Sequence, residues 1–175
     1  KINIKECISD LVEFKTPEMN KMLDYFKNYS VKDVSEGIDY LILYKGKGYQ
    51  MGFGGLHSVD RPAIYHSTED LYVLDADVDS YYPFVMLHYK IKPEHISDVF
   101  FDILDTITTK RIIAKKNKDK ITAETLKITI NSMFGLLNFP NYWLYDPKAA
   151  LSVTINGQMF LLMLIETLEL NGFEV

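Results

Sequence analysis

The sequence has a single cysteine, Cys7, and lacks the patterns of a disulfide-stapled, zinc-binding or membrane-anchored chain. One cysteine excludes an intrachain disulfide, and a reducing compartment such as the cytoplasm is the simplest setting for such a chain. The four histidines are scattered and lack the spacing of zinc ligands. The longest apolar run, Met159–Ile165, is too short to span a bilayer. Residues 1–10 lack the apolar core of a signal peptide, so we expect no membrane partner.

The remaining composition is ordinary for one folded domain or a piece of a larger protein: 175 residues, 47% apolar and 25% charged. A chain of this length can bury a sizeable core, which argues against disorder. The net charge of −5 alone argues against nucleic-acid binding. However, residues 110–127 contain seven basic and two acidic side chains, so this segment is +5 and the remainder −10. Such a patch is typical of a local phosphate site or of a solvated lysine-rich helix end.

Residue periodicity predicts a mixture of helices and strands. The first expected helix begins at Thr16-Pro17, the second covers Pro83 to Tyr89, and the third runs from Pro93 to near Asn117. The fourth covers residues 125–137 with Thr122 as its cap, and the fifth runs from Asp146-Pro147 to Asn171-Gly172. The expected strands are Ile38–Tyr44 and Tyr49–Phe53 around a turn at residues 45–48, a central strand Leu71–Asp77, and a strand beginning at Phe173–Val175. This order predicts an α+β fold with a helical projection.

The acidic stretch after the apolar residues 71–74 is the first candidate site. Asp75, Asp77 and Asp79 would share one face of a regular strand. Three neighbouring carboxylates repel one another unless a cation lies among them, and oxygen ligands favour Mg²⁺, Mn²⁺ or Ca²⁺. The alternative is a surface turn with solvated acids.

Three interpretations compete for this stretch. A calcium loop starting at Asp75 fails, because Ser80 and Met86 occupy the positions that require glycine and glutamate. A haloacid-dehalogenase-type phosphatase would use Asp75 and Asp77, but its usual Gly-Thr-Leu continuation is absent. The run Asp-Val-Asp-Ser-Tyr-Tyr-Pro over residues 77–83 resembles motif A of the family B DNA polymerases, Asp-x-x-Ser-Leu-Tyr-Pro, with tyrosine in place of leucine.

A second match lies downstream. Residues 127–135, Lys-Ile-Thr-Ile-Asn-Ser-Met-Phe-Gly, resemble motif B of the same family, Lys-x-x-x-Asn-Ser-x-Tyr-Gly. Lys127 and Asn131 would lie one turn apart on one helical face. Arg111 and Lys115 match the Arg-x-x-x-Lys of the family's fingers, so three cations on two antiparallel helices would converge on one triphosphate. Looser matches, Phe-Gly-Gly at residues 53–55 and Thr-Ile-Asn-Gly-Gln at residues 154–158, flank these motifs.

The resemblance implies part of a polymerase palm, an antiparallel sheet with helices, plus a two-helix fingers hairpin. Residues 1–92 would hold an N-terminal region and the first part of the palm, residues 93–138 the fingers, and residues 139–175 the return to the palm with a long helix, truncated before motif C. The implied activity is DNA-directed DNA synthesis, in which dNTPs are added to a primer 3′ end by two-metal nucleotidyl transfer with Mg2+.

The resemblance also implies roles for individual residues. Asp77 would be catalytic and bind metal together with the Val78 carbonyl, and Tyr82 would exclude a ribose 2′-hydroxyl. The other dNTP-binding residues would be Tyr81, Arg111, Lys115, Lys127 and Asn131, with Phe134 and Gly135 beside the nascent base pair and template.

No Asp-Thr-Asp-Ser-like motif C follows motif B, so the second metal-binding aspartate is missing. We therefore expect a fragment, inactive alone, that works with an exonuclease, a motif C palm and a thumb on primer–template DNA. Short fingers of this type imply a bacterial cytoplasmic setting with a phage, prophage or plasmid source. A metal-dependent phosphatase or a non-catalytic helical binding module remain the alternatives.

Overall fold

The computed structural model describes residues 1–32, 36–59 and 61–175 and has the α+β class that the sequence predicts. Its helices are the short 3-10 helix η1 (Ile4–Cys7), α1 (Pro17–Lys27), α2 (Tyr81–His88), α3 (Val99–Lys116), α4 (Lys120–Leu136) and α5 (Pro147–Leu170). Its strands are β1 (Ile2–Asn3), β2 (Ser30–Val31), β3 (Asp39–Tyr44), β4 (Lys47–Gly52) and β5 (Leu56–Ser58).

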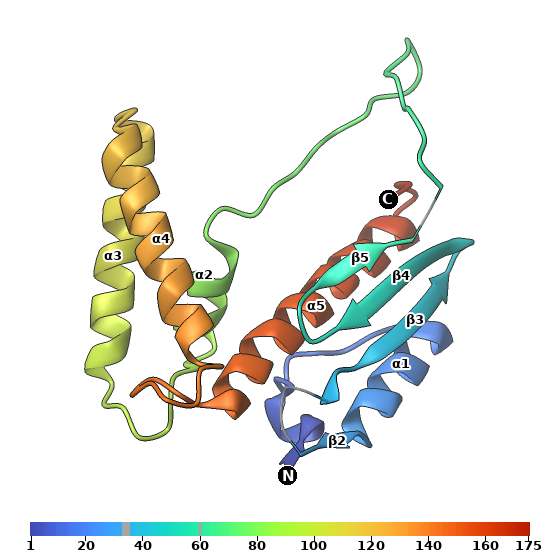
Figure 1. The fold of residues 1–175 in the computed structure, drawn as a ribbon. Helices are drawn as coiled ribbons and strands as arrows, with labels where there is room; N and C mark the ends of the chain where they lie inside the picture. Colours follow the sequence, from blue (N-terminus) through green and yellow to red (C-terminus); the bar gives the residue numbers. More distant parts are fainter. Residues whose placement is uncertain (33–35, 60) are drawn as a thin grey trace.

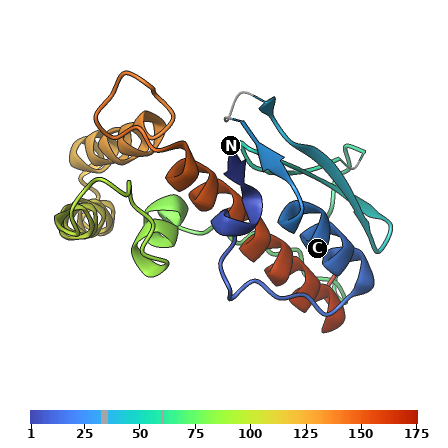
Figure 2. The ribbon, with the colours of Figure 1, turned by 90° about the horizontal axis from the view of Figure 1, so that it is seen from below.

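Strands β3, β4 and β5 form an antiparallel sheet in that order, and β1 pairs with β2 in a second small sheet. The β3–β4 hairpin turns on Lys45 and Gly46, whose φ angles of 48° and 82° are those of a tight two-residue turn. Alternate residues of the hairpin, such as Ile42 and Met51, face a core that α1 and α5 close on one side of the sheet (Figures 1 and 2).

Helix α5 lies between the sheet layer and the α2–α3–α4 layer, as the view from below shows (Figure 2). Pro147 occupies the first turn, and the Asp146 carboxylate accepts a hydrogen bond from the Ala149 amide at 2.9 Å. Leu151 and Ile155 pack into the core beneath the sheet, whereas Val153 packs into the core shared with α2 and α3. By length and composition α5 could cross a membrane, but 67% of its most apolar window is buried inside the protein, so it is a core helix here.

Buried polar side chains on α5 hold the loops around it. The Asn156 amide accepts from the Ser9 amide at 2.7 Å and donates to the Cys7 carbonyl at 2.8 Å. Gln158 donates to the Gly52 carbonyl at 2.7 Å and accepts from its amide at 3.1 Å, which fixes the end of β4. These contacts satisfy backbone groups that would otherwise be buried without partners.

The Glu166 carboxylate, which is 3% exposed, likewise holds the backbone of the N-terminal segment by hydrogen bonds. It accepts hydrogen bonds from the amides of Lys15 and Thr16 at 2.8 to 3.1 Å and from the Thr16 hydroxyl at 2.5 Å. Thr16 is the N-cap of α1 as predicted, but its hydroxyl bonds to Glu166 rather than to its own helix.

The predicted strand Leu71–Asp77 is wrong. Residues 61–79 contain no strand and arch away from the body between β5 and α2 (Figure 1). Leu71, Tyr72 and Leu74 are 54%, 78% and 83% exposed. A strand is stable only beside a partner strand or an apolar surface, and the described residues place neither against this segment. The strand expected to begin at Phe173–Val175 is also absent from the described elements.

Two helix boundaries also differ from the sequence predictions. The helix expected from Pro93 begins at Val99, because residues 93–97 form turns, and the Glu94 amide donates to the Asp146 carboxylate at 3.0 Å. The cap of α4 is Asp119 rather than Thr122: the Asp119 carboxylate accepts from the Thr122 amide at 3.1 Å. Helix α3 ends at Lys116, next to the end predicted near Asn117, and residues 117–119 join it to α4.

We expect Glu166→Gln to lower the free energy of unfolding by about 2 kcal/mol, because an amide at this buried position loses the charge and turns an N–H toward N–H donors. Urea denaturation measures this change. Glu13→Gln, an exposed substitution of the same chemistry, should leave stability unchanged. Equal stability of the two variants would contradict the role given to Glu166.

Candidate functional site

The candidate site lies where the helical hairpin of α3 and α4 faces α2 and α5. The two hairpin helices are antiparallel, and their base packs through Phe100, Leu104 and Leu137 against Val85 of α2 and Val153 of α5. This core holds the basic faces of the hairpin at a fixed distance from the start of α2.

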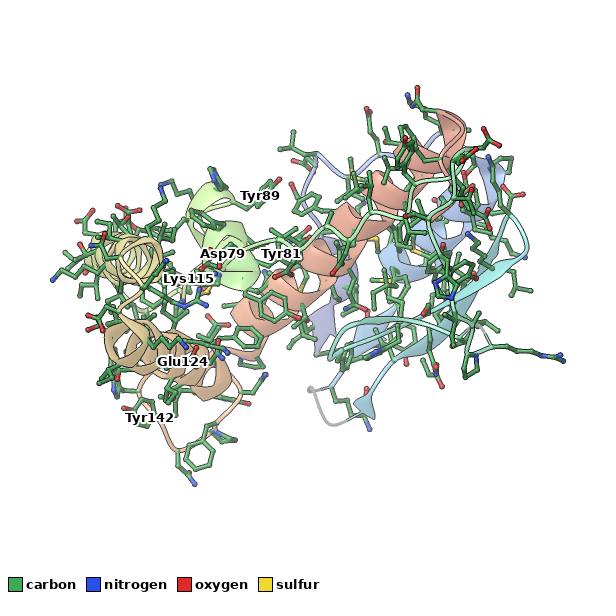
Figure 3. All side chains as sticks on the ribbon, turned by 90° about the horizontal axis from the view of Figure 1, so that it is seen from above. Asp79, Tyr81, Tyr89, Lys115, Glu124 and Tyr142 are labelled. Atoms are coloured by element: carbon green, nitrogen blue, oxygen red, sulfur yellow. The ribbon has the colours of Figure 1, made fainter. Side chains whose placement is uncertain are left out.

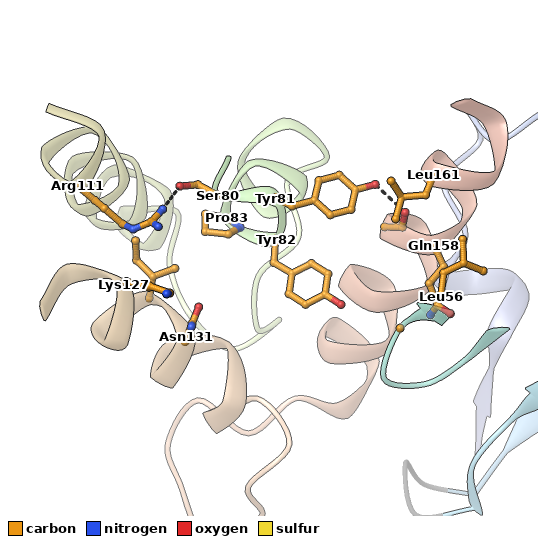
Figure 4. A pocket seen from close by; sticks show the side chains of 13 residues that line it. Leu56, Ser80, Tyr81, Tyr82, Pro83, Arg111, Lys127, Asn131, Gln158 and Leu161 are labelled. Carbon is orange, nitrogen blue, oxygen red and sulfur yellow. Dashed lines mark hydrogen bonds between the residues drawn. The ribbon is translucent and has the colours of Figure 1, made fainter. Parts of the chain in front are cut away.

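Ser80, at the start of α2, has left-handed backbone angles of φ 55° and ψ 43°. This conformation is uncommon for a residue with a side chain and costs about 1 kcal/mol or more. It reverses the chain sharply, so that Asp79 before the turn reaches the hairpin while Tyr81 and Tyr82 after it point toward α5 (Figures 3 and 4). The turn thus divides a charged end of the site from an aromatic end.

The aromatic end is fixed by two hydrogen bonds. The Tyr81 hydroxyl donates to the Gly157 carbonyl at 2.6 Å, and the Tyr82 hydroxyl donates to the Gly54 carbonyl at 3.2 Å. A Cβ at Gly157 would lie 3.4 Å from one atom of each tyrosine ring, at the short end of ordinary van der Waals contact, so both rings lie close against α5 at this residue. Burial, with smaller effects of neighbouring tyrosines, raises the pKa of Tyr81 to about 12 and keeps its hydroxyl a donor. The Tyr82 ring also packs on Phe134, with centroids 4.8 Å apart.

The charged end brings Asp79 to the predicted phosphate-binding cations. Lys115 Nζ lies 2.9 Å from Asp79 Oδ2, and Arg111 Nη1 lies 3.4 Å from Asp79 Oδ1 and also donates to the Ser80 hydroxyl. Figure 3 shows Asp79 beside Lys115. The hydrogen bond from Lys115, with the charges of both cations, holds the pKa of Asp79 below its usual value. Sequence analysis gave Asp79 no role at the triphosphate site.

A pocket of about 390 Å³ connects the two ends (Figure 4). Five of the residues predicted from the sequence to bind nucleotide line it: Tyr81, Tyr82, Arg111, Lys127 and Asn131. Gly55 and the Gly157-Gln158 pair, which belong to the two loosely matching flanking motifs, line it as well. Ile130, which lies within the motif B match, also lines the pocket. Leu56 and Leu161 complete the apolar wall, and no motif in the sequence points to either of them.

The remaining predicted residues lie outside this lining. Lys115 is turned to Asp79, and Phe134 lines a small adjoining cavity behind Tyr82. Asp77 and Val78 lie in the extended segment before Ser80, and Val78 is 47% exposed. The expectation that Asp77 ends a strand is wrong, because the strand itself is absent.

A magnesium site does not form from the acidic residues alone. Within the part of the chain that the structure describes, no three His, Cys, Asp or Glu side chains gather as metal ligands. Asp79 is turned to two cations, which leaves Asp77 without a second converging carboxylate. The described residues therefore do not complete a two-ion centre by themselves, and the common face predicted for Asp75, Asp77 and Asp79 is wrong.

Comparison with known proteins adds one similarity. The chain is 27% identical to DNA polymerase II of Escherichia coli (strain K12) over 146 aligned residues, which cover 70% of this chain and 18% of that protein. No family model matches, and no solved structure matches. The chain thus spans less than a fifth of the length of this relative. The similarity agrees with the polymerase motifs and supports a polymerase fragment.

Tyr81→Phe should lower the free energy of unfolding by about 1 kcal/mol, because it removes one neutral hydrogen bond to the Gly157 carbonyl. The matched control is Tyr72→Phe, since Tyr72 is 78% exposed in the extended segment. Denaturant unfolding of both variants provides the measurement. If Tyr81→Phe is as stable as the control, the hydroxyl does not anchor α2 to α5.

Proposed function

We propose that this chain is the nucleotide-binding part of a family B DNA-directed DNA polymerase, which adds dNTPs to a primer 3′ end. One observation carries the proposal: Arg111 and Lys127, from two different helices, line one pocket with Tyr82, a residue of the motif A match. The similarity to a bacterial DNA polymerase supports it independently.

The charge distribution in the pocket suits a nucleoside triphosphate. Arg111 and Lys127 lie on the hairpin wall, and Arg111 is only 13% exposed, so its charge acts in a partly desolvated setting. A guanidinium can bind two phosphate oxygens at once, and a lysine adds a mobile point charge. Lys115, 2.9 Å from Asp79 at the same end, would add a third cation. The volume of about 390 Å³ lies in the range of small-molecule sites.

The aromatic end suits the sugar and base. We assign the Tyr82 ring to the position under the sugar, where it would clash with a ribose 2′-hydroxyl. Packing on Phe134 and the hydrogen bond to Gly54 hold the ring in one orientation. Asn131 lines the pocket one helical turn beyond Lys127, and Phe134 and Gly135 would border the nascent base pair and template.

In the whole polymerase we assign Asp77, with the Val78 carbonyl, to the two-metal centre of nucleotidyl transfer. The described residues supply no second carboxylate for that centre, so the chain alone should bind nucleotide without catalysing synthesis. An exonuclease, a motif C palm and a thumb are the partners that the proposal requires, together with primer–template DNA. A phage, prophage or plasmid source belongs to the same proposal.

Neither alternative has an observation in its favour. A phosphatase built on Asp75 and Asp77 would leave the pocket lined by Tyr82, Arg111 and Lys127 without a role. A purely structural helical module would not need a cation pair and an aromatic pair around one pocket.

Lys127→Ala should weaken dATP binding to this chain about tenfold, because it removes a charge-assisted contact worth roughly 1.4 kcal/mol. Isothermal titration with dATP measures the effect. Lys120→Ala removes the same charge at the exposed start of the same helix and should change affinity less than about twofold. Equal losses of dATP affinity in both variants would show that the chain attracts dATP only through its positive charge, which would contradict the proposal.

In the unmodified chain we expect dATP to bind about tenfold or more tightly than ATP, the equivalent of a clash of about 1.4 kcal/mol between the Tyr82 ring and the 2′-hydroxyl. Tyr82→Ala removes the ring and should abolish this preference. Tyr82→Phe keeps the ring and should keep the preference. Competition binding with the two nucleotides gives the ratio, and a thermal melt confirms that each variant is folded. A folded Tyr82→Ala chain with unchanged preference would show that Tyr82 does not face the sugar.

A further inference from the structure

We infer that Asp79 is an internal competitor of the triphosphate: its carboxylate occupies Arg111 and Lys115 when no nucleotide is bound and must be displaced for binding. This inference rests on the proposed function and assigns a further affinity-determining residue to the same site. It begins from the two short contacts at the charged end, 2.9 Å to Lys115 and 3.4 Å to Arg111, made by different oxygens of one carboxylate.

Asp79 and Ser80 satisfy only some of the hydrogen-bond donors of the Arg111 guanidinium. One terminal nitrogen, Nη1, makes both contacts that Arg111 has at this end, to Asp79 and to the Ser80 hydroxyl. Its Nε is buried and has no hydrogen-bond partner among the described residues. A buried donor without a partner is costly, and a guanidinium is shaped to bind paired oxygens. Asp79 therefore satisfies Arg111 only in part, whereas a polyphosphate offers several oxygens together.

The position of Asp79 allows displacement. Its side chain is 45% exposed and so is that of Lys115 at 46%, which means that the ion pair is screened and weak. Asp79 precedes the left-handed Ser80, outside the first turn of α2, so its side chain can leave the cations without unwinding the helix. A polyphosphate carries several negative charges, whereas the Asp79 carboxylate carries one. A polyphosphate would therefore displace Asp79 from the two cations at modest concentration.

Competition and a purely structural role predict opposite signs. If Asp79 only holds the Ser80 turn in place, removing its charge loosens the site and weakens anion binding. If Asp79 competes, removing its charge frees two cations and strengthens anion binding. Glu124 lies 3.6 Å from Lys127 and forms an ion pair with that one cation. Asp79 is the stronger case because it pairs with two cations, one of which belongs to the 13% exposed Arg111 side chain.

The test is isothermal titration of the chain with inorganic tripolyphosphate at low ionic strength. Asp79→Asn should bind about three- to tenfold more tightly than the unmodified chain, the size expected from losing two partly exposed ion pairs. Asp105→Asn, which removes one charge from an exposed position on α3, should differ by less than about twofold. The gain in Asp79→Asn should shrink as salt is added.

The outcomes separate the inference from the proposed function. Unchanged or weaker binding in a folded Asp79→Asn chain overturns the inference, and if Lys127→Ala still weakens tripolyphosphate binding, the proposed triphosphate site stands. Absence of binding in both the unmodified and the Asp79→Asn chains overturns the site and the inference together. Tighter binding in Asp79→Asn and not in Asp105→Asn supports the competition.

Discussion

Burial of α5 between two layers is the constraint on which the rest of the structure depends. The helix is apolar along most of its length, yet three polar side chains, Asn156, Gln158 and Glu166, are 2% to 3% exposed and are used to hold neighbouring backbone. The tyrosines of α2 pack directly on this helix at Gly157, whose carbonyl accepts a hydrogen bond from the Tyr81 hydroxyl. Both cores therefore share one wall, and the pocket opens at the seam between them.

The left-handed turn at Ser80 gives the site two chemically different ends, one charged and one aromatic. Before the turn, a carboxylate meets Arg111 and Lys115, and after it two tyrosine rings meet α5. Strain in such a turn is tolerated when the surroundings hold both sides, as they do here. The separation of positive charge from aromatic surface is what a nucleotide, with its phosphates at one end and its base at the other, would match.

The sequence predicted the elements that local interactions determine. The helices could be found because apolar spacing and the Asp146-Pro147 start act within a few residues, and the β3–β4 hairpin because its turn residues adopt positive φ angles. The strand over residues 71–77 could not, since strand formation depends on a partner that no local pattern reveals.

The candidate site divides in the same way. The resemblance to motifs A and B and to the fingers pattern indicated Tyr82, Arg111, Lys127 and Asn131, and the structure brings these four residues to one pocket. The ion pairs of Asp79 depend on a contact between residues more than thirty positions apart in sequence, and no spacing rule predicts them. The expected acidic cluster failed because the strand that would align its members is absent.

Backbone amide chemical shifts during a dATP titration test most directly whether this seam is a nucleotide site. We expect the shifts to concentrate at residues 80–83, at Arg111, over residues 127–131 and at residues 157–158, the segments that line the pocket. Shifts confined to other surfaces, such as the groove beside Cys7 and Ser9, or no shifts at dATP concentrations of about 1 mM, would contradict the account.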